Sequence, residues 1–65
     1  MSYWYIQYEN DEIRGYTILK INEPYFSFTT ISNRMRKMLK MNDGYLQFSF
    51  IMPVSEASYL DFKNK

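Results

Sequence analysis

The chain must fold without a covalent or metal crosslink, and this constraint limits it more than any other feature. It has 65 residues, no cysteine and no histidine. A chain this short forms one domain, here residues 1–65, with a core that is marginal by itself. Aromatic side chains, at 20% of the residues, are the main remaining source of buried area. We therefore expect a single domain whose core is built from aromatic residues or completed by a partner.

The same composition argues against catalysis. Histidine and cysteine are the usual general bases, nucleophiles and transition-metal ligands of small enzymes. The chain also has no Gly-rich phosphate loop and no G-x-S-x-G motif. We expect a non-enzymatic protein with no catalytic residue, cofactor or metal site. Because no signal peptide and no apolar run of about 18 residues is present, we expect it in the cytoplasm and not in a membrane.

The first third of the chain is typical of a β-hairpin. Residues 2–8 and 13–21 are rich in aromatic and β-branched side chains, and the polar run 9–12 between them predicts a turn. A turn explains the carboxylates of that run better than a metal site does. Gly15, inside the second strand, marks either a bulge or a close approach of another group.

A helix is predicted to follow, from the N-cap Ser27 to about residue 42. Asn42, Asp43 and Gly44 are expected to stop it, with Gly44 in a left-handed conformation. The apolar side chains of this helix recur at helical spacing and are expected to face the core: Ile31, Met35, Met38 and Leu39.

Residues 45–52 alternate again and predict a third strand, which Pro53 closes. One face of this strand is expected to carry Leu46, Phe48, Phe50 and Met52. Ser55 is predicted to cap a short helix through residue 62, which needs Tyr59 or Leu60 to dock on the body.

This β-β-α-β order with a short C-terminal helix predicts an α+β fold. The economical topology is a three-stranded antiparallel sheet in the order 2-1-3, with one helix packed on one face. The opposite face would display tyrosine and phenylalanine, and both outer strands would have free edges.

Two sets of residues are candidates for partner binding. The net charge of +1 conceals a basic stretch without acids, whose side chains would contact phosphates or an acidic protein surface unless they form an ordinary solvated helix face. This basic set comprises Asn33, Arg34, Arg36, Lys37 and Lys40. Exposed tyrosines would act as anchors or stack on bases, although most aromatic residues are needed for the core. The tyrosine set comprises Tyr3, Tyr5, Tyr16 and Tyr45.

The chain resembles a group of very short bacterial and phage proteins. The resemblance lies in the Tyr-rich opening strand (residues 3–8), the hairpin, the single basic helix, the alternating strand and the tail at residues 53–59. It implies an accessory protein of a phage or mobile element, a class that includes anti-CRISPR inhibitors. Such inhibitors commonly occupy the nucleic-acid-binding surface or guide RNA complex of a nuclease.

The leading hypothesis is therefore a non-enzymatic inhibitor or adaptor that binds a host protein or ribonucleoprotein, with an RNA-guided nuclease as the specific candidate. A small protein that binds RNA or single-stranded DNA is the first alternative. A homodimer that closes its sheet edge by symmetry is the second.

Overall fold

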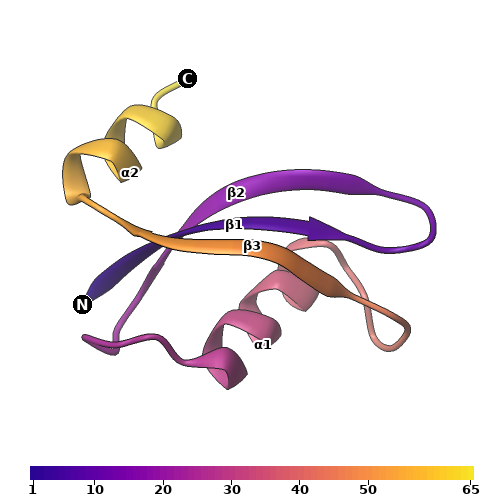
Figure 1. Ribbon diagram of the computed structural model, residues 1–65. Coiled ribbons are helices and arrows are strands. Elements are labelled where there is room, and N and C mark those ends of the chain that lie inside the picture. The colour runs from indigo at the N-terminus through magenta and orange to yellow at the C-terminus, as the bar shows by residue number, and fades with distance from the viewer.

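A computed structural model describes all residues, 1–65 (Figure 1). It confirms the α+β fold, with three strands and two helices in the order β-β-α-β-α. The elements are β1 (Ser2–Glu9), β2 (Arg14–Ile21), α1 (Phe28–Met38), β3 (Gln47–Val54) and α2 (Glu56–Lys63). None of the helices is long and apolar enough to cross a membrane.

The three strands form one antiparallel sheet in the predicted order β2-β1-β3, with β1 in the centre. The two helices lie on opposite sides of this sheet (Figure 1). Because side chains alternate along each strand, every strand presents one set of residues to α1 and the other set to α2.

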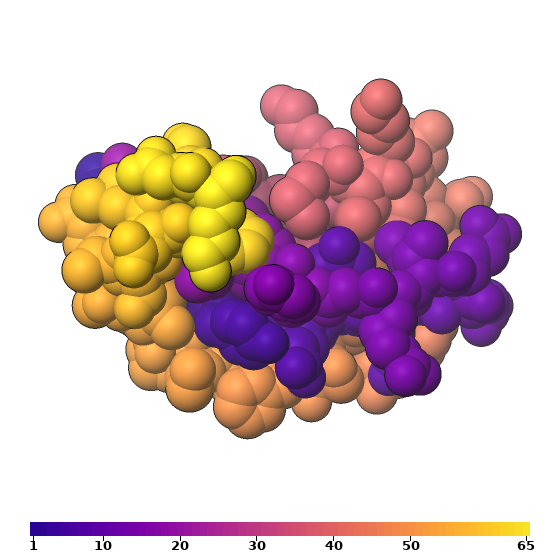
Figure 2. All heavy atoms as spheres, turned by 90° about the horizontal axis from the view of Figure 1, so that it is seen from above, coloured from indigo at the N-terminus to yellow at the C-terminus, as the bar shows by residue number.

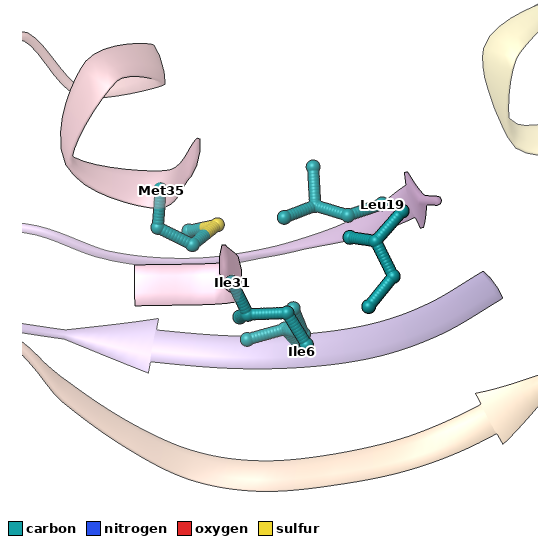
Figure 3. Close-up of a cluster of buried hydrophobic side chains, with 5 residues drawn as sticks. Ile6, Leu19, Ile31 and Met35 are labelled. Atoms are coloured by element: carbon teal, nitrogen blue, oxygen red, sulfur yellow. The ribbon is translucent and has the colours of Figure 1, made fainter. Parts of the chain in front are cut away.

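The core lies between α1 and the sheet and is small. Five hydrophobic residues are buried, and four of them are labelled in Figure 3: Ile6, Leu19, Ile31 and Met35. Trp4, Tyr8, Phe48 and Ile51 pack around this cluster without being fully buried. The aromatic residues therefore surround an aliphatic centre, whereas the sequence indicated an aromatic core.

The hairpin between β1 and β2 depends on a glycine. Gly15 pairs directly with Tyr8 across the two strands. A Cβ atom at Gly15 would lie 2.7 Å from the hydroxyl oxygen of Tyr8, so the tyrosine ring lies over the glycine. Of the two roles predicted for Gly15, the structure shows the close approach, since β1 and β2 pair there without a register shift.

The predicted N-cap of α1 is confirmed, but its predicted end is wrong. The Ser27 side chain accepts a hydrogen bond from the backbone N–H of Thr30. The helix ends at Met38, and Lys40 follows in a left-handed conformation with φ 58°. Backbone N–H groups of Lys40 and Met41 donate to the carbonyls of Lys37 and Arg36, which is the Schellman pattern.

Lys40 thus occupies the position where glycine is usual, and a side chain there costs about 1 kcal/mol. Gly44 also has a positive φ, 98°, but it lies in the loop after the helix and does not stop it. The core prediction is wrong at Met38, the last residue of the helix, which is 44% exposed, whereas Leu39 packs against the core.

β3 differs most from its prediction. It runs from Gln47 to Val54 and includes Pro53, which does not close it. The register against β1 shifts by one residue, so that Phe50 pairs with Gln7 while Phe48 pairs with Tyr8. Ser49 is the extra residue of this β-bulge.

The bulge divides the apolar residues of β3 between the two faces. Phe48 and Ile51 pack on the core, whereas Phe50 and Met52 are exposed on the side of α2. A single predicted face with Leu46, Phe48, Phe50 and Met52 is therefore wrong, because one inserted residue reverses every side chain that follows it.

We expect Gly15→Ala to lower the free energy of unfolding by about 1 kcal/mol, because the Tyr8 ring must move out of its packed position. Urea unfolding measures the change. In a Tyr8→Leu background the same substitution should be neutral or stabilising. An equal loss in both backgrounds would show that the Tyr8 contact is not the cause.

The hydrogen bond between Thr30 and Glu23 beside the cap of α1 makes a pH-dependent contribution to the free energy of unfolding. The Thr30 hydroxyl donates to the Glu23 carboxylate and is the main reason that the pKa of this carboxyl lies below its usual value. The resulting stabilisation is present above the usual pKa and is lost as the pH falls through the lowered pKa. We expect Thr30→Val to raise the pKa of Glu23 and to reduce this acid-side loss, measured by NMR titration and by urea unfolding at neutral and acid pH. An unchanged pKa of Glu23 would refute the assignment.

Candidate functional site

A row of four aromatic rings crosses the sheet face on the side of α2. The centroids of Phe50 and Tyr5 are 6.1 Å apart, those of Tyr5 and Tyr16 5.8 Å, and those of Tyr16 and Phe62 5.9 Å. We call Phe50, Tyr5, Tyr16 and Phe62 the aromatic row. It links all three strands to α2, since β3, β1, β2 and α2 contribute one ring each.

The aromatic row is ordered yet accessible. Tyr16 is 59% and Phe50 48% exposed, while Tyr5 is half-buried between them. The side-chain amide of Gln7 donates to the Tyr5 hydroxyl at 3.1 Å. These rings contact each other at centroid distances typical of aromatic pairs, so little side-chain entropy is left to lose when a partner covers them.

α2 covers only one end of this face (Figure 2). As predicted, Tyr59 docks on the body: its ring lies 5.1 Å from that of Tyr3, whereas Leu60 stays exposed. The Tyr3 hydroxyl donates to the Glu56 carboxylate at 3.0 Å. Loss of solvent around the ring, followed by this bond and the charge of Glu56, raises the pKa of Tyr3. Tyr3 therefore holds α2 on the sheet and belongs to the docking contact.

Both free edges of the sheet are poor templates for another strand. On β3, Pro53 offers no N–H and the bulge at Ser49 interrupts the ladder. On β2, Arg34 donates from Nη1 to the carbonyl of Lys20 at 3.0 Å. Side chains of α1 lie beside the outer edge of β2 (Figure 2). The accessible feature of the sheet is therefore its face.

The basic set divides into two groups. Arg34 binds the Lys20 carbonyl, and Arg36 donates from Nη2 to the carbonyl of Gly44 at 3.1 Å. Both arginines thus stabilise the fold. Lys37 and Lys40 make no side-chain hydrogen bond or salt bridge, and the one salt bridge of the molecule joins Arg14 to Glu9.

The structure does not place the whole basic set on one helix face. Lys40 lies beyond the end of α1 and not on its surface. It still comes close to part of the set, because the chain reverses there. A hollow at this end of α1 is lined by Asn33, Arg36, Lys37, Lys40, Met41 and Asn42.

Tyr45, the fourth predicted anchor, lies apart from the other tyrosines. It is 55% exposed and lines an apolar groove between α1 and β3 with Phe28, Leu46 and Phe48. Phe28 and Phe48 meet edge to face in this groove, with centroids 5.7 Å apart. The groove lies on the α1 side of the sheet, so Tyr45 cannot act together with Tyr5 and Tyr16.

Sequence reasoning did not identify Phe50 and Phe62 as members of the site. The sequence predicts Phe50 on the same face as Phe48 because the two alternate regularly, and no residue type signals a bulge at Ser49. Phe62 could have been found, since its spacing from Tyr59 places both on one side of a helix. No three potential metal ligands come together in the structure.

We expect Arg36→Gln to lower the free energy of unfolding by about 1 kcal/mol, because the carbonyl of Gly44 loses its partner. Lys37→Gln also removes one positive charge from α1 and should change the free energy of unfolding by less than about 0.5 kcal/mol. Urea unfolding compares the two variants. Equal losses would mean that charge, and not the hydrogen bond, accounts for the effect.

Comparison with protein-family models, with curated proteins and with solved structures finds no match to this chain. The functional proposals below therefore rest on the chemistry of the aromatic row and of the hollow at the end of α1.

Proposed function

We propose that this chain is a non-enzymatic binding protein that holds a partner protein against the aromatic row. The observation that carries the proposal is the row itself: rings from three strands and α2 contact one another in sequence, and Tyr16 and Phe50 remain exposed. Tyrosine and phenylalanine in such clusters are typical anchors of protein interfaces.

The size of the core supports the same proposal. Only 6 of the 65 residues are buried, and several large apolar side chains are left at the surface of the α2 side. Met52 adds a flexible apolar contact at the edge of the row, 42% exposed. A partner that covers this face would extend the buried apolar area that a short chain lacks.

The finer proposal concerns the kind of partner. An inhibitor or adaptor works by occupying a surface, which a preformed aromatic face does well without catalysis. The sequence resemblance favours a host protein or ribonucleoprotein, and an RNA-guided nuclease is the specific candidate. Pairing of two copies through a sheet edge is less favoured, because Arg34, Ser49 and Pro53 disrupt both edges.

The test compares substitutions inside and outside the row. We expect Tyr16→Thr and Phe50→Thr each to weaken partner binding about 30-fold, the effect of losing about 2 kcal/mol at an interface anchor. Threonine keeps the β-propensity of both positions. The partner is captured from a host lysate, identified by mass spectrometry, purified and titrated by calorimetry.

Tyr25→Thr is the matched control, since Tyr25 is 64% exposed but lies outside the sheet. It should bind as the unmodified chain does. If a double variant at Tyr16 and Phe50 still binds the purified partner with full affinity, the row is not the interface. Capture of nucleic acid without protein would favour the first alternative, a nucleic-acid-binding protein.

A further inference from the structure

We propose that the hollow at the C-terminal end of α1 binds the phosphates of a nucleic-acid strand. This site goes beyond the proposed function, because it lies with α1 on the opposite side of the sheet from the aromatic row (Figure 1). Three cations and two amides line it: Arg36, Lys37, Lys40, Asn33 and Asn42.

None of these cations forms a salt bridge. The hollow contains no carboxylate in its lining, and none of its three cations has a carboxylate within salt-bridge distance. A surface kept merely soluble usually mixes charges of both signs. Three uncompensated cations in one concavity give a local positive potential, which attracts a polyanion.

The hollow has a fixed wall. The Arg36 side chain is half-buried, and its bond to the Gly44 carbonyl ties the guanidinium to the loop after α1. One nitrogen is used there, so the guanidinium keeps donors for a ligand. A held arginine beside two free lysines combines one oriented contact with two adaptable ones.

A purely structural role does not explain the position of Lys40. Cations in the last turn of a helix offset its dipole, which accounts for Arg36 and Lys37. The helix dipole does not account for a lysine in the left-handed position after the helix, where glycine fits without strain. A charged side chain at a strained position points to a function for its charge.

The lining favours phosphates over an acidic peptide. Asparagine amides and lysine ammonium groups are common donors to phosphate oxygens. The adjoining pocket, which shares Lys40 with the hollow, carries Asp11, Glu12 and Asp43, and these acids repel a polyanion on that side and leave the surface of α1 as its path. Neighbouring phosphates along a strand can engage Arg36, Lys37 and Lys40 together.

The test measures binding of a short fluorescent oligouridylate to the full chain at several salt concentrations. Three phosphate contacts predict that log K falls with log salt at a slope of about −2. We expect Lys40→Gly to reduce the slope to about −1.4 and to raise the melting temperature by about 4 °C, because strain is relieved. Loss of binding together with gain of stability separates this role from a structural one.

Lys65→Gly, at the C-terminus and outside the hollow, also removes a lysine side chain and should leave the salt-dependence slope unchanged. Tyr16→Thr should also leave the slope unchanged, so this test is independent of the test of the aromatic row. No binding of the RNA at low salt would overturn the proposal. Equal slopes for the Lys40 and Lys65 variants would do the same, as would tighter binding of polyglutamate than of the RNA.

Discussion

Ile6 packs against Ile31 and Met35 with no exposed surface on any of the three, and the rest of the molecule is arranged around that contact (Figure 3). Ile6 lies on the central strand, so α1 must sit over the middle of the sheet to cover it. Leu19 on β2 completes the cluster. A core this small leaves little room for large rings, and the aromatic side chains are displaced to its rim and to the opposite face of the sheet.

The bulge at Ser49 determines what that opposite face can do. Without the inserted residue, Phe50 would point toward α1, and the ring of Tyr5 would have no aromatic neighbour on β3. With it, β3 contributes a ring to each side, Phe48 to the rim of the core and Phe50 to the aromatic row. The same irregularity weakens β3 as a template for another strand, so a single residue both places Phe50 in the aromatic row and protects the edge.

The cations show how equal charges acquire different roles through position. Arg34 and Arg36 reach backbone carbonyls that the sheet edge and the loop would otherwise leave without a protein partner. Lys37 and Lys40 have no such partner and stay available to solvent or ligand. The Schellman turn at the end of α1 keeps Lys40 in the same hollow as Arg36 and Lys37, although Lys40 lies beyond the last helical residue.

Sequence alone determined the order of the elements, the sheet order 2-1-3 and the caps Ser27 and Ser55, because these depend on local periodicity, capping chemistry and short connections. It left Gly15 open between a bulge and a close approach, and it offered Tyr5, Tyr16 and the basic set as candidates for binding. Only the tertiary structure decided where α1 ends, which face Phe50 occupies and which cations are free. The bulge at Ser49 depends on pairing with the distant strand β1, and the left-handed turn at Lys40 forms without the glycine that usually marks such a turn in a sequence.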